Sequence, residues 1–513
     1  MKRNLFVILI IFLLNFQALV LARDLEFKRT FFSTVPSFRP NTPEMVSIFR
    51  DRLDICLDEK QYFKVIFLGG RSTNSTKLAS YFSPVGTRTT FNVGELGSSL
   101  VLNSQDDVIA NYFNILTAPL APSGSTAEFT DYTFESEVTF NPKQVFAGFA
   151  FNYHRHLSKT QDSGWWIDFI FPLKWVKNDM RMRENVIKAG GPGGDDPEVP
   201  RTFFPNMTTA LKSQYFKYGR IDGAQSAFGI ADIYLMLGYT YFTNDSMHFD
   251  TFWGAVLPTS NKPKGEFMFE PIYGNNCHAG ILSGASIGVR IWKDCQRAIY
   301  WELDTCGTLL TSNTQTRSFD LFDKTWGRYM WVYLSDKASF TSPGINNFTK
   351  VLNVSPGTMR DLNFAFVLEH PKYRAEFGYH YFARAAEKIS LSKPWMDNVA
   401  IATIINANGD FVTKAEPKTS RDRSTISDYL GVLNDTNSSG TDIFRQITED
   451  DLDLNSAAHP STITHTFYLA GSYHWGCDCR RPQYVGLGIA YDDSSDNTAL
   501  NRVDLWLKYG IEF

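Results

Sequence analysis

Strict alternation of apolar and polar residues is the feature that most restricts how this chain can fold. In residues 372–384 the odd-numbered positions include Tyr373 and Phe377, whereas the even-numbered positions include Arg374 and Glu376. Successive side chains of a β-strand point to opposite faces. The segment therefore predicts a strand with one apolar, aromatic face and one mostly charged face.

A second alternating segment, residues 361–369, comes just before this one. The apolar faces of the two segments match, and they predict a hairpin with its turn at His370 and Pro371. In that register Glu369 lies opposite Lys372, an opposite-charge pair that favours the hairpin.

The same alternation recurs in ten further segments, which gives twelve candidate strands. Most of them are 9 to 16 residues long, more than the five or six typical of soluble sheets, and suit strands tilted across a bilayer. The ten segments are Tyr132–Phe140, Gln144–Leu157, Trp165–Trp175, Phe228–Thr243, Met247–Pro258, Gly280–Trp292, Ala298–Leu310, Ile463–Trp475, Tyr484–Asp492 and Val503–Phe513.

Conventional membrane helices and several other classes are excluded by composition. After residue 22 the chain has no uninterrupted apolar stretch of 18 residues, so a membrane-embedded form would have to be a closed barrel. Aromatic residues make up 15% of the chain, far too many for a disordered or fibrous protein. A net charge of −4 gives no electrostatic reason to expect a nucleic-acid partner.

The first 22 residues predict a secretory signal peptide. Lys2 and Arg3 precede an apolar run from Leu5 to Leu14, and Ala22 supplies a small residue at the expected cut. An uncleaved anchor is the alternative, but the run is shorter than the ~20 residues that a helix needs to cross a bilayer.

The connections between the candidate strands alternate between short and long. Short ones fall near 158–164, 244–246, 293–297, 370–371 and 476–483. The long ones, predicted as external loops, are 176–227, 259–279, 311–357 and 385–462, with shorter external links at 141–143 and 493–502. Transmembrane barrels have this arrangement, with short periplasmic turns and long external loops.

The last strand carries the most specific signal, because its apolar face ends at the final residue, Phe513. That face consists of Val503, Leu505, Leu507, Tyr509, Ile511 and Phe513. Over residues 130–513 the chain resembles the outer-membrane β-barrel proteins of Gram-negative bacteria, of the porin or hydrophobic-solute channel kind. The resemblance implies residence in the bacterial outer membrane, contact with its lipid, and recognition of the strand ending in Phe513 by the barrel-assembly machinery.

The predicted fold is therefore all-β, a transmembrane antiparallel up-and-down β-barrel of about 12 strands, with a range of 10 to 16. Residues 1–22 form the signal peptide, and residues 128–513 form the barrel. Residues 23–127 are less regular and could be a periplasmic appendage, a plug inside the barrel or extra strands. Within them, Tyr62–Leu68 followed by two glycines suggests one strand.

The polar strand faces would line the lumen of such a barrel, where charged side chains tune selectivity. The alternative is that opposed charges pair and close a narrow barrel, since barrels of ~8 strands are filled and those of ~16 strands are open. The predicted pore-lining residues are Asp232, Glu302, Asp304, Asp361, Lys372, Arg374, Glu376, His380 and Arg384.

Three motifs suggest chemistry only weakly. Gly284 to Gly288 match the G-x-S-x-G pattern of serine hydrolases, but the motif lies inside an alternating strand, so close packing is the better interpretation. Cys295, Cys477 and Cys479 would lie at the periplasmic rim, where a disulfide is favoured over a metal site, with unpaired thiols as the default. His154 and His156 are two possible ligands without a third, so no metal or cofactor is predicted.

The predicted function is a channel or passive transporter for small solutes, and no enzymatic activity is expected. One alternative is a monomeric uptake protein for hydrophobic compounds. Others are an adhesin and a barrel enzyme of the phospholipase or protease type, which should have a Ser, His or Asp cluster near one rim. The solute, the oligomeric state and the openness of the lumen stay undetermined at this level.

Overall fold

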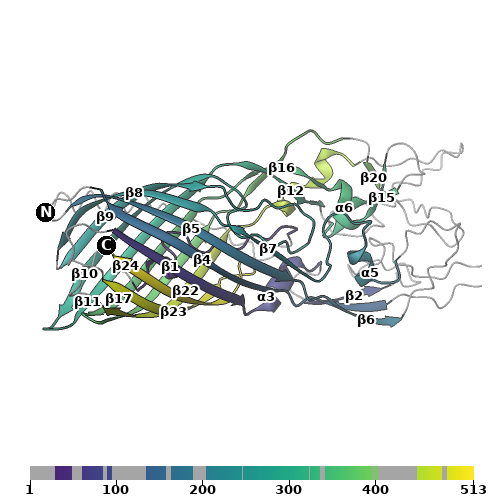
Figure 1. Ribbon diagram of the computed structural model, residues 1–513. Coiled ribbons are helices and arrows are strands. Elements are labelled where there is room, and N and C mark those ends of the chain that lie inside the picture. The colour runs from purple at the N-terminus through teal and green to yellow at the C-terminus, as the bar shows by residue number, and fades with distance from the viewer. Residues whose placement is uncertain are drawn as a thin grey trace, which may run out of the picture.

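The computed structural model describes residues 29–48, 61–84, 89–94, 135–157, 163–188, 204–244, 246–322, 324–334, 341–396, 399–401, 447–475 and 482–512. Its main element is a closed antiparallel barrel (Figure 1). The wall strands are β1 (Gln61–Ser72), β4 (Lys143–His156), β5 (Gly164–Asp179), β7 (Ala224–Ile230), β8 (Ile233–Asn244), β9 (Met247–Leu257), β10 (Gly280–Lys293), β11 (Ala298–Leu310), β17 (Met359–His370), β18 (Tyr373–Arg384), β22 (Thr462–Trp475), β23 (Gln483–Ser494) and β24 (Arg502–Glu512).

The sheet has 13 strands, but β7 and β8 share one position because both pair with β5. The wall therefore has twelve positions, as the sequence predicted. β1 closes the barrel by pairing with β24 on one side and with β4 on the other, so that Tyr62 lies opposite both Glu512 and His154. Closure gives every wall strand except β7 a partner on both sides, as the absence of water in a bilayer favours.

One of the twelve predicted strands is present but does not belong to the barrel wall. The segment Tyr132–Phe140 contributes β3 (Glu135–Thr139), which pairs with β2 (Thr90–Gly94) and β6 (Arg183–Lys188) in a small sheet beyond the barrel rim. Its place in the wall belongs to β1, so the barrel sheet begins upstream of residue 128.

Short turns and long connections alternate as the sequence predicted. The strand ends that are joined by the short links β4–β5, β8–β9, β10–β11, β17–β18 and β22–β23 lie at one end of the barrel, here called the turn end. The long connections and the β23–β24 link gather at the other end, here called the cap end.

The β17–β18 hairpin is confirmed, but its register differs from the predicted one by two residues. Pro371 and Lys372 form the turn, so that Glu369 lies opposite Arg374 and not opposite Lys372. The fixed φ of proline suits the first central position of a tight turn, which moves the turn one residue along the chain. Lys372 is exposed in that turn.

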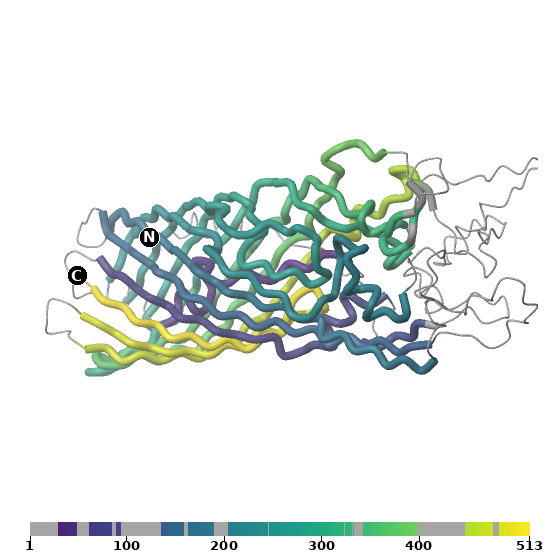
Figure 2. Tube along the Cα trace, turned by 45° about the vertical axis from the view of Figure 1, so that its right-hand side comes forward, coloured from purple at the N-terminus to yellow at the C-terminus, as the bar shows by residue number. Residues whose placement is uncertain are grey.

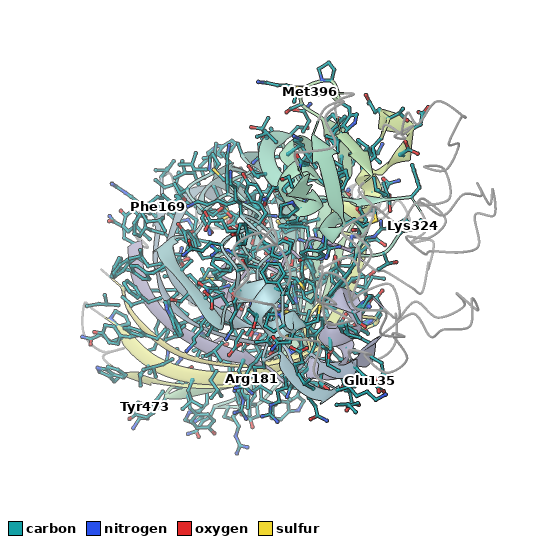
Figure 3. The ribbon with its side chains drawn as sticks, turned by 90° about the vertical axis from the view of Figure 1, so that its right-hand side faces the viewer. Glu135, Phe169, Arg181, Lys324, Met396 and Tyr473 are labelled. Atoms are coloured by element: carbon teal, nitrogen blue, oxygen red, sulfur yellow. The ribbon has the colours of Figure 1, made fainter. Side chains whose placement is uncertain are left out.

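The two faces of the wall differ in polarity. The outer face carries large apolar side chains, among them Phe377, Leu469 and Leu487, which are 52%, 57% and 67% exposed. In the view from the cap end, Phe169 and Tyr473 lie at the periphery (Figure 3). Inward positions such as Glu376 and His380 are buried. This is the polarity of a barrel whose outer face contacts lipid.

Replacing Phe377 with arginine should reduce the amount of folded barrel. The side chain would place a charge in hydrocarbon, at a cost of about 2–4 kcal/mol near the midplane. The measurement is heat-modifiable migration on gels after refolding into lipid vesicles. Phe377→Leu is the control and should fold normally, and equal yields of the two variants would contradict the outward placement of Phe377.

The long connections fold into a cap over the barrel wherever the structure describes them. The predicted loops 311–357 and 385–462 contain β-structure, and the predicted loop 176–227 contains a short helix. Cap strands are β12 (Asn313–Ser318), β13 (Asp320–Leu321), β14 (Trp331–Leu334), β15 (Thr341–Pro343), β16 (Thr349–Ser355), β19 (Lys388–Leu391), β20 (Val399–Ile401) and β21 (Leu452–Asp453). Helices near them are α3 (Ser75–Phe82), α5 (Met207–Lys212) and α6 (Gly344–Asn347), with 3-10 turns η1 (Gly327–Tyr329), η2 (Glu449–Asp451) and η3 (Leu454–Ala457).

The cap has a hydrophobic core of its own, in which Trp326, Tyr329, Phe348 and Leu352 are buried. Burial of this apolar surface fixes the arrangement of the connections. Of the helices within the described ranges, none is long and apolar enough to cross a membrane.

Candidate functional site: the barrel lumen

The lumen contains residues 29–48, here called the inner segment (Figure 2). At the cap end, the backbone N–H of Thr30 donates to the carbonyl of Ser456 at 2.9 Å. Toward the turn end, the N–H of Ile48 donates to Oε2 of Glu376 at 3.1 Å. The segment includes the short helix α2 (Pro43–Val46), and nearly all of its residues are buried. Residues 29–48 therefore run along the barrel from one end toward the other.

Cations of the wall hold the inner segment through its oxygen atoms. Lys508 on β24 donates to the carbonyls of Met45 and Ser47, and Arg502 on the same strand donates to the carbonyl of Val35 at 3.2 Å. Other strands supply two more anchors. Lys174 on β5 lies 3.3 Å from Ser37 Oγ, and Arg384 on β18 donates to both oxygens of Ser33 at 3.0 Å. The segment is thus fixed from several sides of the barrel.

One cation points the other way, from the inner segment to the wall. Arg39 Nη2 lies 2.6 Å from Oδ1 of Asp361 on β17, and the guanidinium stacks 4.4 Å from the ring centre of Phe382 on β18. His380 Nε2 hydrogen-bonds to the same oxygen of Asp361 at 2.9 Å. Arg39 and Asp361 are both buried, so each supplies the charge that the other needs in a dry environment.

Eight of the nine residues predicted to line a pore are buried at inward positions, and the exception is Lys372 in the exposed turn. The structure brings Asp361 and His380 into direct contact. Arg374 pairs with Glu369 at 2.7 Å, and Glu376 accepts from Tyr468 at 2.8 Å. Pore lining as such stays a prediction.

The remaining predicted residues are spread over other strands. His248 Nε2 lies 3.3 Å from Oε2 of Glu302, and Asn363 donates to Asp304 at 3.1 Å. Asp232, between β7 and β8, accepts from Ser260 at 2.8 Å and from the backbone N–H of Asn275 at 2.6 Å. Polar contacts within the wall and with the cap therefore compensate for burial of these groups.

The sequence offered a plug inside the barrel as one of three alternatives for residues 23–127, and it placed Asp361 and Arg384 inward. It did not predict which residues of the inner segment these side chains contact. Arg502 and Lys508 both lie on the polar face of the last strand, and the alternation of that strand places them inward. Arg39 lies in a stretch without periodicity, where no local signal indicates what it contacts.

Aromatic side chains lie flat against glycines of neighbouring strands and so leave room for the inner segment. A Cβ added at Gly378 would overlap the ring of Tyr468, and one at Gly238 would overlap Trp166. The same relation links Gly70 with Phe146, Gly284 with Phe252, Gly488 with Trp506 and Gly510 with Tyr484. Cavities of about 10 and 20 Å³ beside the inner segment have room for roughly one water each. Around the part of the inner segment that the structure describes, the lumen therefore has little free space.

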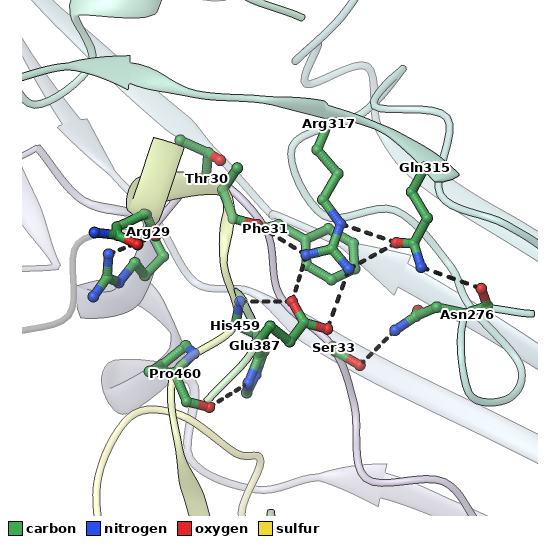
Figure 4. A network of polar contacts seen from close by, with 12 residues as sticks. Arg29, Thr30, Phe31, Ser33, Asn276, Gln315, Arg317, Glu387, His459 and Pro460 are labelled. Atoms are coloured by element: carbon green, nitrogen blue, oxygen red, sulfur yellow. Dashed lines mark hydrogen bonds and ion pairs between the residues drawn. The ribbon is translucent and has the colours of Figure 1, made fainter. Parts of the chain in front are cut away.

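A buried polar network joins the inner segment to the cap (Figure 4). Arg317 donates to Glu387 at 2.5 and 3.2 Å, and its guanidinium lies 3.5 Å from the ring centre of Phe31. Gln315 accepts from Arg317 at 2.9 Å, and Glu387 also accepts from the backbone N–H of His459 at 2.8 Å. The network fixes the cap end of the inner segment.

The protonation states within this network follow from the surroundings of each group. Burial alone would raise the pKa of Glu387, but the charge and hydrogen bonds of Arg317 lower that pKa to about 2. Burial, followed by the charge of Arg384, holds the pKa of His459 well below its usual value. Near neutral pH the network therefore contains an ionised carboxylate and a neutral imidazole.

The weaker motifs have structural explanations. Ser286, the serine of the G-x-S-x-G pattern, is buried inside β10 and donates to Asp304. A Cβ at Gly284 or at Gly288 would overlap neighbouring side chains, as close packing requires. Cys295 is an exposed, unpaired thiol, whereas Cys477 and Cys479 lie outside the described residues. Within the described part of the chain, no group of three or more His, Cys, Asp or Glu side chains is placed to hold a metal ion.

The fold defines a closed, twelve-stranded barrel of the outer-membrane type, with an apolar exterior and an interior that contains both polar and apolar side chains. No protein-family model matches the chain, and no curated protein matches it either. Among solved structures, the chain is similar to the COG4313 outer membrane channel from Pseudomonas putida F1, with 10% identity, a TM-score of 0.40, and coverage of 90% of this chain and 98% of that one.

Two other similar structures are the transport unit of the autotransporter AIDA-I from Escherichia coli and a FadL homologue from Pseudomonas aeruginosa. Both are 6% identical to the chain, with TM-scores of 0.32 and 0.28. Coverage is 88% of this chain and 90% of that chain for the first, and 95% and 97% for the second. Likeness at this level says nothing about side-chain chemistry, and the barrel architecture rests on the strand pairing itself.

Proposed function

We propose that the protein is a bacterial outer-membrane barrel that passes small solutes through its lumen, and that the inner segment closes the lumen at rest. The observation that carries the proposal is that the inner segment lies inside the barrel without belonging to its wall. In the described residues, no backbone-to-backbone hydrogen bond joins residues 31–48 to a wall strand. The contacts come instead from side chains such as Lys508, Arg502 and Asp361.

These contacts can be exchanged for water without damage to the barrel. The wall strands keep their ladder hydrogen bonds when the inner segment leaves, because the ladder runs only between wall strands. The groups then exposed include charged and hydroxyl-bearing side chains, which water can hydrate. They also include apolar side chains such as Ile66 and Leu282, so the vacated lumen would be partly apolar. A vacated lumen would be a wet path lined in part by the predicted residues, where charges tune passage.

Export and assembly follow from the two ends of the chain. Residues 1–22 would direct export as a signal peptide. The last strand, which ends in Phe513, would be recognised by the barrel-assembly machinery and would then close the barrel against β1. The partners proposed are outer-membrane lipid, this machinery and a small-molecule solute, and no enzymatic activity is proposed.

Deletion of residues 30–47 should convert a closed barrel into a conducting one. Planar-bilayer recordings of the purified full chain should show rare or no current steps, and the deletion variant should show discrete, frequent steps. Deletion of residues 415–445 is the control and should leave the barrel closed. Heat-modifiable migration verifies that each variant is folded, and a folded deletion variant that stays silent would refute the proposal.

A further inference from the structure

The contacts of Arg39 define a site that belongs to the barrel wall. Asp361 presents both of its oxygens to the guanidinium, at 2.6 Å from Nη2 and 3.4 Å from Nε. This two-point geometry matches the planar fork of a guanidinium and not the single point of an ammonium group. The ring of Phe382 covers one face of the guanidinium at 4.4 Å, a favourable cation–π position.

The wall groups are held in place independently of Arg39. Asp361 lies on β17, and His380 and Phe382 lie on β18, which is paired with β17 along its whole length. His380 hydrogen-bonds to Oδ1 of Asp361 and fixes the orientation of the carboxylate. Arg39, in contrast, comes from the inner segment, and one of its nitrogens donates to Pro36 of the same segment. The wall groups that form the site and the arginine that occupies it therefore belong to separate parts of the molecule.

If the Arg39 side chain is removed while the inner segment stays in the lumen, as in an Arg39→Ala variant, the Asp361 carboxylate is left buried without its cationic partner. An uncompensated buried charge is strongly unfavourable, whereas a second guanidinium restores the same contacts. The vacant site therefore favours the entry of a matching group.

We infer that Asp361, His380 and Phe382 form a binding site for a guanidinium group of a solute, which Arg39 occupies in the closed barrel. The role of the site in transport rests on the proposed function, but binding itself does not. The guanidinium could belong to a small free solute or to an arginine side chain of an extended peptide, as it does in the inner segment.

The test is calorimetric titration of the refolded full chain in detergent micelles. Argininamide should bind saturably to the Arg39→Ala variant and not to the wild type, whose site is occupied. Citrullinamide, a neutral molecule of nearly the same shape, should bind at least about tenfold more weakly, as loss of hydrogen bonds to a charged group implies. Adding Asp361→Asn to Arg39→Ala should weaken argininamide binding by a similar factor.

Binding of argininamide that is no tighter to Arg39→Ala than to the wild type, or that is unaffected by Asp361→Asn, would overturn the inference. Titration with the tripeptide Gly-Arg-Gly shows which kind of molecule carries the guanidinium. A site for peptides should bind the tripeptide more tightly than argininamide, and a site for small solutes should not. If Arg39→Ala does not assemble, Arg39→Gln keeps a polar side chain but lacks the guanidinium and its charge, and argininamide binding is compared with the wild type in the same way. Binding without conductance in the deletion variant would refute the proposed function alone, and conductance without binding would refute this site alone.

Discussion

Replacing Arg317 with methionine should lower the free energy of unfolding by about 3–5 kcal/mol, because Glu387 would be left as a buried charge without its partner. The side chain of Arg317 is 0% exposed and that of Glu387 is 3% exposed, so water cannot take over the lost contacts. The measurement is urea unfolding of the refolded protein in micelles, followed by tryptophan fluorescence.

The double variant Arg317→Met/Glu387→Met should recover most of that loss, since it removes both charges together. A matched exposed pair provides the control. Arg297 lies 3.9 Å from Asp294 in the β10–β11 turn with both side chains well exposed, and Arg297→Met should cost at most about 1 kcal/mol. Similar losses of unfolding free energy for Arg317→Met and Arg297→Met would show that water reaches the Arg317–Glu387 pair.

The pH dependence of this effect has a definite sign. The pKa of Glu387 is lowered to about 2 in the folded protein, so its contribution to stability is complete above the ordinary carboxyl pKa and is lost as the pH falls through about 2. The wild type should therefore lose stability relative to Glu387→Met on acidification through this range.

The wall of the barrel was largely predictable because each strand buries one face and exposes the other to lipid. Alternation alone, however, cannot choose between two candidate strands. Tyr132–Phe140 alternates as well as Gln61–Ser72 does, and only the second pairs with the last strand. That choice depends on a contact between opposite ends of the chain, which no local pattern encodes.

The lumen was predictable in part for the same reason. Side-chain parity places Asp361, Glu376 and His380 inward, and the structure confirms their burial. Side-chain parity also places Lys372 inward, but the turn includes Pro371 and Lys372, so Lys372 does not belong to a strand. The inner segment has no periodicity, because side chains of the surrounding wall, and not a ladder of backbone hydrogen bonds, determine its path.

Replacing Gly378 with valine should destabilise the barrel by about 2–5 kcal/mol, from overpacking together with loss of a hydrogen bond to a buried carboxylate. A Cβ at this position would overlap the ring of Tyr468, which lies against Gly378 and donates to Glu376 at 2.8 Å. The ring would have to swing into the lumen, toward the inner segment.

Gly471→Val on the paired strand β22 is the matched control for this effect. A Cβ there would meet only the carbonyl of Arg374 at 3.6 Å, an ordinary contact, and valine suits a strand better than glycine does. The double variant Gly378→Val/Tyr468→Ala should recover part of the stability that Gly378→Val loses, because it lacks the ring that the valine displaces. The free energies of unfolding are measured with urea. Equal losses for Gly378→Val and Gly471→Val would contradict the packing of the Tyr468 ring against Gly378.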